Sequence, residues 1–347
     1  MNVKDNSQKR LRVAVLCGGI SSEREISLES GRAVLEQLDS QCYETKLYDL
    51  ADFISNGKDL SATLLADSDV VFLALHGPGG EDGTLQGLLE LYGLPYTGSG
   101  VLASALAMDK AMTKLIYRQA GLPVAPDLSF SFQEVAECPV QEIAGQVADA
   151  LGFPVIVKSN NQGSTRGVLL ASNLATFESA WAEAKRYHSG IIVEAFVKGR
   201  EFTVPVIGGK QPAALPVVEI IPKKASFFTY EAKYEPGGSE EIVPAALETE
   251  LTGRLQELGL AAHRALGCWG VSRTDILLSW EGQPVLLETN TIPGMTENSL
   301  LPKSLRAAGW SLSRFADCLI NWAFERSALL QLERQPGPKL LVKHSPS

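Results

Sequence analysis

Two short runs, Gly270-Val271-Ser272-Arg273-Thr274-Asp275 and Leu286-Leu287-Glu288-Thr289-Asn290-Thr291, are the most informative part of this sequence. Both are short and rich in apolar and β-branched residues, which is typical of β-strands. The polar stretch Trp280-Glu281-Gly282-Gln283 lies between them and predicts a turn. If this turn has even length and is centred on Glu281 and Gly282, paired residue numbers sum to about 563. Asp275 then lies opposite Glu288, and Arg273 lies opposite Asn290.

These four polar side chains are expected to share one face of the hairpin, because side chains two apart on a strand point the same way. Two carboxylates directly opposite each other destabilise a sheet. A hard cation between them reverses this effect, and a few oxygen ligands suit Mg²⁺ that also carries substrate phosphates. We therefore predict a magnesium–nucleotide site. The alternative is an ordinary hairpin with a charged, solvent-facing surface.

Composition describes a globular protein that has room for two or three domains, with 347 residues of which 45% are apolar. Its net charge of −9 argues against nucleic acid as a partner. No apolar run approaches the roughly 20 residues of a membrane span, and the polar start predicts no signal peptide. The five cysteines form no CxxC pair, which indicates reduced thiols in a cytoplasmic protein.

The first part of the chain alternates strands with helices, which predicts a parallel α/β sheet. We expect this N-terminal domain to cover residues 1–108. Its predicted strands are 11–17, 42–48 and 70–75, and its predicted helices are 23–38 and 83–92.

The remaining chain predicts two further domains. Residues 109–196 read as a small α+β unit that begins with a helix at 109–120. Residues 197–327 read as mostly antiparallel strands with two helices, near 248–265 and 312–327. The tail, 328–347, contains Gln335-Pro-Gly-Pro and is predicted to be mobile.

Glycine-rich loops follow two of the predicted strands. The loop from Lys158 to Val168 contains Gly163 and Gly167, so its backbone N–H groups can approach a phosphate closely. A simple Gly-Ser hairpin turn would look similar. The loop from His76 to Gly83 lies at the carboxyl end of a strand, where ligands bind in open α/β sheets.

Other polar residues near these loops have both a functional and a structural interpretation. Glu23, Glu81 and Asp82 lie close to helix starts, where negative charge is favourable in any protein. Lys233 and Tyr234 belong to an aromatic, glycine-flanked segment that fits a loop closing over a site. Three further candidates are Glu201 as a ligand of ribose hydroxyls, Gly294 as a backbone donor to an oxyanion, and Ser299 as a ligand of a carboxylate. The alternative for Glu201 is a charge at the edge of the sheet. The alternative for Ser299 is an ordinary helix N-cap.

Taken in order, these motifs resemble the D-alanine–D-alanine ligases of the ATP-grasp superfamily. The resemblance extends from about residue 11 to 327. The motifs that carry it are Gly18-Gly-Ile-Ser-Ser-Glu-Arg-Glu-Ile-Ser, His76-Gly-Pro-Gly-Gly-Glu-Asp-Gly-Thr-Leu-Gln-Gly, Met108-Asp-Lys, Gly163-Ser-Thr-Arg-Gly-Val, Glu231-Ala-Lys-Tyr and Leu287-Glu-Thr-Asn-Thr-Ile-Pro-Gly-Met-Thr.

The resemblance implies a fold and an activity. The fold is an ATP-grasp: an N-terminal parallel α/β sheet, a small α+β lid domain and a C-terminal domain with a mixed or antiparallel sheet. The activity is ATP-dependent ligation of two D-alanines through an acyl phosphate, for peptidoglycan precursors, in a cytoplasmic homodimer. The alternative is a ligase of the same fold that takes D-lactate, D-serine or another second substrate.

The resemblance also implies residue roles. Glu23 holds the first ammonium, His76 positions that substrate, and Arg273 with the Gly294 N–H stabilises the oxyanion. ATP is bound by Lys110, Lys158, Glu194 and Glu201. Two Mg²⁺ ions (Mn²⁺ is an alternative) are bound by Asp275, Glu288 and Asn290. Ser164 and Tyr234 hydrogen-bond with Glu23, and Lys233 and Ser299 orient the second carboxylate.

Five positions depart from the family's usual pattern. All lie in the glycine loop or beside the adenine. They are Ser159, Gln162, Thr165, Arg166 and Ala195.

Overall fold

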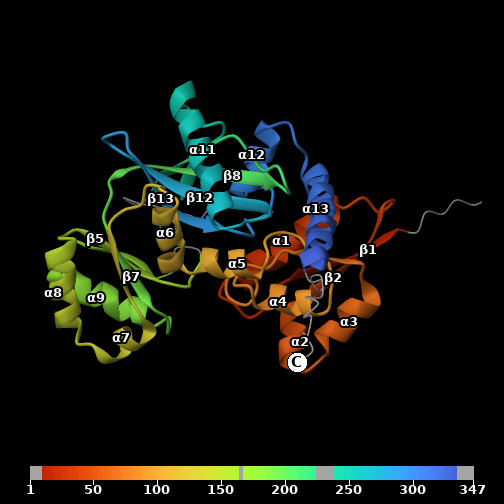
Figure 1. Cartoon of the computed structure of the whole chain (residues 1–347), viewed down its shortest axis with the longest axis horizontal. Helices are drawn as coiled ribbons and strands as arrows, with labels where there is room; N and C mark the ends of the chain where they lie inside the picture. Colours follow the sequence, from red (N-terminus) through yellow and green to blue (C-terminus); the bar gives the residue numbers. More distant parts are fainter. Residues whose placement is uncertain (1–9, 164–166, 224–237, 334–347) are drawn as a thin grey trace, which may run out of the picture.

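The computed structural model describes residues 10–163, 167–223 and 238–333, and these ranges form three sheets with helices packed against them (Figure 1). The small sheet of the central residues lies at one end of the long axis. The sheet of the N-terminal residues lies towards the other end, and the largest sheet lies between them. This arrangement confirms the predicted ATP-grasp type of architecture, which mixes α/β and α+β units.

The N-terminal sheet is parallel, as predicted, with the strand order β2-β1-β3. Residues of β1 and β3 are buried throughout most of their length, because helices cover the sheet. The elements are β1 (Leu11–Cys17), α1 (Arg24–Gln37), β2 (Tyr43–Asp49), α2 (Leu50–Asn56), α3 (Leu60–Asp67), β3 (Val70–Leu73) and α4 (Thr84–Leu91).

The central unit is a four-stranded antiparallel sheet in the order β4-β7-β5-β6. Its own apolar core includes Phe177 and Trp181, whose rings lie 5.8 Å apart. The elements are β4 (Asp127–Phe130), α7 (Phe132–Glu137), α8 (Val140–Ala150), β5 (Val155–Ser159), β6 (Val168–Ala171), α9 (Leu174–Lys185) and β7 (Ile191–Ala195).

The largest sheet has six strands and is antiparallel, with the order β11-β10-β8-β12-β13 and β9 paired to β8. Helix α11 packs against β8 and β12 (Figure 1). The elements are β8 (Gly199–Gly208), β9 (Ala213–Ala214), β10 (Val218–Pro222), β11 (Ser239–Ile242), α11 (Thr249–Ala265), β12 (Gly270–Ser279), β13 (Pro284–Asn290), α12 (Leu300–Ala307) and α13 (Leu312–Glu333).

The predicted hairpin register is confirmed at the site but not beside the turn. Asp275 pairs with Glu288 and Arg273 pairs with Asn290. Next to the turn, Ile276 pairs with Leu286, so the register shifts by one residue. The turn is therefore centred on Glu281 and not between Glu281 and Gly282, and a bulge at Leu287 restores the predicted alignment of the two carboxylates.

Two helices join units that are distant in sequence. Helix α6 (Lys110–Gln119) follows α5 (Val101–Met108) and packs with the C-terminal sheet, where Tyr117 is fully buried. Helix α13 places Phe315 and Leu319 in the core of the N-terminal unit. These helices fix the N-terminal and C-terminal units against each other.

Several short elements escaped the sequence analysis. They are α2, α3, α5, α7, β4 and α12, none longer than eight residues, and such segments show too few turns for a clear period. The last predicted helix, 312–327, is longer than expected, because α13 continues to Glu333. Residues 334–347 lie outside the described part of the chain. No helix within the described ranges is both long and apolar enough to span a bilayer.

The packing of α11 on β12 buries His263. Its Nδ1 atom lies 2.7 Å from the Ser272 hydroxyl oxygen. Burial lowers the pKa of His263 from 6.5 to about 4. The unfolded chain therefore takes up this proton at a higher pH than the folded chain, and stability falls as pH falls between these two values.

We predict that His263→Gln lessens the loss of stability on acidification. When the pH falls from 7 to 5, His263 is expected to lower the free energy of unfolding by about 2 kcal/mol. Glutamine does not titrate, so the variant should not lose this stability. The midpoint of thermal unfolding should therefore drop less in the variant than in the wild type. His188→Asn, at an exposed histidine, is the control and should behave like wild type. Equal drops in wild type and His263→Gln would contradict the assignment.

Candidate active site

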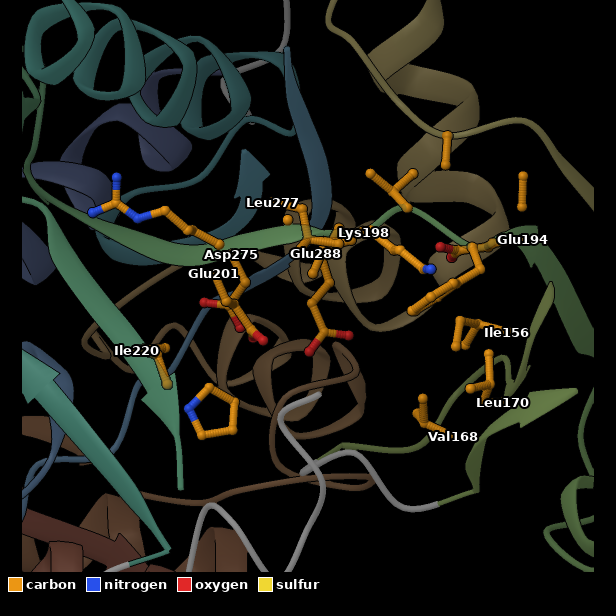
Figure 2. A pocket seen from close by; sticks show the side chains of 18 of the residues that line it. Ile156, Val168, Leu170, Glu194, Lys198, Glu201, Ile220, Asp275, Leu277 and Glu288 are labelled. Atoms are coloured by element: carbon orange, nitrogen blue, oxygen red, sulfur yellow. The ribbon is translucent and has the colours of Figure 1, made fainter. Parts of the chain in front are cut away.

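A cavity of about 660 Å³ lies between the central sheet and the C-terminal sheet. Ile156, Val168 and Leu170 form an apolar wall on the side of the central sheet (Figure 2). The carboxylates of Glu201, Asp275 and Glu288 lie on the opposite side, on β8, β12 and β13. One apolar wall and one acidic wall suit a ligand with a flat apolar part and a part that carries cations.

The acidic wall is a consequence of strand register. Asp275 lies opposite Glu288 on β13 and opposite Thr203 on β8, while Glu201 lies opposite Leu277. Because paired residues and residues two apart share a face, all three carboxylates project from the same face of the sheet.

Neighbouring groups hold the central carboxylate in place. The Arg273 guanidinium donates to both Asp275 oxygens at 3.0 Å, and the Thr203 hydroxyl donates to Oδ1 at 2.6 Å. Asp275 is only 4% exposed. On the other face of the hairpin, Thr274 and Thr289 are hydrogen-bonded at 2.7 Å. The carboxylate is thus held by two neighbours on its own face, and the threonine pair joins the two strands on the opposite face.

Lys110 approaches the acidic wall from the start of α6. Its Nζ atom donates to the Gln162 carbonyl oxygen at 2.6 Å and lies 3.5 Å from Glu288 Oε2. Lys110 and Glu288 also line a small cavity of about 20 Å³ with Gly163 and Asn290. The structure therefore brings the predicted Lys110, Glu288 and Asn290 together.

Lys158 and Glu194 form the other charged wall of the large cavity. The Lys158 ammonium donates to Glu194 Oε2 at 3.0 Å. Burial alone would lower the pKa of Lys158, but the negative charges of Glu194 and Glu288 outweigh it and raise this pKa. Burial would likewise raise the pKa of Glu194, yet the nearby lysines hold it below its ordinary value. Both groups are therefore held in their charged forms.

Glu23 lies where the N-terminal unit meets the glycine loop. It occupies the N-cap position of α1 but its side chain does not cap the helix, and it is 7% exposed. A Cβ atom at Gly163 would clash with the Glu23 carboxylate, and one at Gly77 would lie 2.7 Å from Oε2. Both glycines are needed for this close approach, which puts Glu23 between the two loops.

His76 is buried beside α1, and its Nε2 atom lies 2.9 Å from the Ser30 hydroxyl oxygen. Burial lowers the pKa of His76 to about 4, so its ring is neutral at physiological pH. The same Ser30 hydroxyl accepts from the Met295 N–H at 3.4 Å. His76 and Ser30 thus connect the N-terminal unit with the loop that follows β13.

Glu81 is not the charge at a helix N-terminus that its position in the sequence indicated. Helix α4 is capped at Gly83, and Glu81 is buried. Its carboxylate accepts from the Gly77 N–H at 2.6 Å and the Ile292 N–H at 3.3 Å. Burial and the charge of Glu23 raise the pKa of Glu81 to about 8. Asp82, by contrast, does accept from the Thr84 N–H at the helix start.

Gly294 and Ser299 lie together in the loop before α12. A Cβ atom at Gly294 would lie 2.8 Å from Ser299 Oγ. Ser299 is the N-cap of α12, but its side chain does not cap the helix and instead lies 2.8 Å from the Thr296 hydroxyl. Its hydroxyl therefore faces the glycine rather than the helix.

The sequence analysis also missed Lys114, which contacts Glu194 below the cavity at 3.2 Å. The sequence feature that could have indicated this role is the spacing of four residues between Lys110 and Lys114, which puts both on one helix face.

Three of the positions that depart from the usual family pattern lie within the described residues. The Gln162 carbonyl accepts from Lys110, the Ser159 hydroxyl lies 2.8 Å from the Ser189 hydroxyl, and Ala195 lines the cavity. Five singled-out residues lie outside the described ranges: Ser164, Thr165, Arg166, Lys233 and Tyr234.

Two sequence families match this chain. They are the D-ala D-ala ligase N-terminus over residues 53–99 and the D-ala D-ala ligase C-terminus over residues 116–321. The D-alanine–D-alanine ligase of Syntrophobacter fumaroxidans is 45% identical over 92% of this chain and 99% of its own length.

Solved structures show the same relationship. The D-alanine–D-alanine ligase of Bacillus anthracis, in complex with ATP, superposes with a TM-score of 0.76 at 33% identity, covering 92% of this chain and 99% of its own. The VanG D-Ala:D-Ser ligase of Enterococcus faecalis gives a TM-score of 0.78 at 28% identity, covering 91% of this chain and all of its own (100%). By sequence and by fold, this chain belongs to the D-alanine–D-alanine ligase family.

Proposed function

We propose that this protein joins two D-alanines into D-alanyl-D-alanine with ATP, for the synthesis of peptidoglycan precursors. The observation that carries the proposal is the opposition of Asp275 and Glu288 at the wall of a cavity of about 660 Å³, which Lys110 lines beside Glu288 and Lys158 lines beside Glu194. Phosphoryl transfer depends mainly on positioning and on neutralisation of charge, and this arrangement supplies both.

The acidic wall fits magnesium ions that carry the triphosphate. Among the described residues no three His, Cys, Asp or Glu side chains form a metal cluster. Mg²⁺ does not need one, because it keeps several waters and takes one or two carboxylates plus phosphate oxygens. Asp275 and Glu288 provide those carboxylates, and the Asn290 amide oxygen is the third ligand. When bound, such ions would neutralise negative charge on the phosphates during transfer.

The other side chains orient the substrates. Glu23 binds the ammonium of the first D-alanine, whose carboxylate attacks the γ-phosphate and becomes an acyl phosphate. The amine of the second D-alanine then attacks that carbonyl, and phosphate leaves. Arg273 and the Gly294 N–H stabilise the oxyanion that forms at this carbon.

Five further residues complete the proposed site. His76 supports the first substrate, while Ser299 and Lys233 bind the second carboxylate. Ser164 and Tyr234, which lie outside the described residues, are assigned hydrogen bonds with Glu23 on the family resemblance alone. Each of the three proposed domains, 1–108, 109–196 and 197–327, contributes part of the site, so closure excludes water from the acyl phosphate.

An exposed apolar groove on the N-terminal unit supports a homodimer as the assembled form. Ile20, Ile54 and Leu91 line it and are 69%, 53% and 84% exposed. Contiguous exposed apolar surface of this kind is typical of interfaces. The five free cysteines support a reducing, cytoplasmic location.

Substrate choice is tested by phosphate release with ATP and a panel of acceptors. We expect turnover with D-alanine alone, and much slower turnover when D-serine or D-lactate must serve as the second substrate. L-alanine is the negative control. Absence of phosphate release with D-alanine, alongside release with another acceptor, would contradict the proposed specificity.

Glu288→Gln is expected to lower kcat by roughly 100-fold or more, because the transferring phosphate loses charge stabilisation. Binding of a non-hydrolysable ATP analogue, measured by calorimetry, should stay within a few fold of wild type. Glu281→Gln is the matched control, since Glu281 is exposed in the turn of the same hairpin. Near-wild-type kcat in Glu288→Gln would remove this residue from the site.

The homodimer is tested by sedimentation velocity at micromolar concentration. Wild type should sediment at twice the chain mass of 37.3 kDa. The double variant Ile54→Glu/Leu91→Glu should sediment as a monomer, because it places charge in the groove. Leu332→Glu, at an exposed leucine on α13, should leave the dimer intact. A monomeric wild type would overturn the assignment.

A further inference from the structure

The side chain of Lys114 has no exposed surface. It lies behind Glu194, a residue that lines the proposed nucleotide cavity. It is on the same face of α6 as Lys110, one turn later. Lys110, Lys158 and Glu194 line the cavity, whereas Lys114 is not among the residues that do so. Lys114 therefore cannot touch a ligand in that cavity, and any role there must act through another side chain.

The ammonium of Lys114 shares a carboxylate oxygen with the ammonium of Lys158. Glu194 Oε2 lies 3.2 Å from Lys114 Nζ and 3.0 Å from Lys158 Nζ. A second carboxylate, Asp127, lies 3.4 Å from Lys114 Nζ and is also paired with Arg118. Lys114, Lys158 and Arg118 thus share the carboxylates of Glu194 and Asp127, and Lys114 competes directly with Lys158 for Glu194.

Burying the Lys114 ammonium destabilises the fold. Burial lowers the pKa of Lys114, against the attraction of Glu194 and Asp127, which favours the charged form. An apolar side chain of similar length would fill the same space without burying a charge, and such replacements are often neutral or stabilising. Without Lys114, Glu194 would pair with Lys158 alone and neutralise it.

We propose that Lys114 is a positioning residue for the triphosphate. Because Lys114 offsets part of the negative charge of Glu194, the Lys158 ammonium stays available to the phosphates of ATP. Glu194, the shared partner of the two lysines, lies across the cavity from Asp275 and Glu288 (Figure 2). The inference rests on the proposed function, because it assumes that the large cavity binds ATP. It adds a buried residue that weakens the pairing of Glu194 with the phosphate-binding Lys158.

The test compares two ligands, a non-hydrolysable ATP analogue and adenosine, whose affinities are measured by calorimetry. Lys114→Met should weaken binding of the analogue roughly tenfold, within the range of coupling between neighbouring residues, and binding of adenosine less than twofold. In a Lys158→Met background, Lys114→Met should lower the affinity for the analogue less than twofold, because the effect of Lys114 acts through Lys158. Lys185→Met, at an exposed lysine on α9, should change neither affinity.

Circular dichroism and the melting temperature establish that each variant is folded; if Lys114→Met is not, Lys114→Gln takes its place. Equal weakening of the analogue and adenosine would overturn the inference, since it would indicate that Lys114 only shapes the base-binding region. If Lys114→Met lowered the affinity for the analogue tenfold both in wild type and in Lys158→Met, the inference would be overturned as well. Failure of wild type to bind the analogue would instead overturn the proposed function.

Discussion

The opposition of two carboxylates on adjacent strands is the constraint on which this site depends. Asp275 and Glu288 are paired across β12 and β13, an arrangement that costs a sheet stability unless positive charge lies nearby. Arg273 and Lys110 supply part of it at 3.0 and 3.5 Å. Glu201 adds a third carboxylate to this wall. In the proposed function, Mg²⁺ carried by ATP balances the added negative charge of the phosphates and of this third carboxylate.

The site is assembled by contacts between units that are far apart in sequence. The Glu81 carboxylate accepts from N–H groups of Gly77 in the N-terminal unit and Ile292 after β13. Lys110 donates to the Gln162 carbonyl of the glycine loop. These bonds hold the three loops around a small shared space, where a reactive acyl phosphate can be kept from water.

Sequence reasoning predicted the parts of the site that depend on local pattern. The alternation of strand residues and the glycine turn gave the pairing of Asp275 with Glu288, because register follows from counting. The bulge at Leu287 was not predictable, since nothing in the composition marks the extra residue. Glu81 and Lys114 were missed because their roles depend on burial and on partners more than 70 residues away, which a linear sequence does not display.

We infer that the acidic wall binds nucleotide through divalent cations. The decisive measurement is the rise in melting temperature that a non-hydrolysable ATP analogue produces, with Mg²⁺ and with EDTA, in wild type and in Asp275→Asn. We expect a larger rise with Mg²⁺ than with EDTA in wild type, and loss of that difference in the variant. An equal rise in wild type with Mg²⁺ and with EDTA would contradict it.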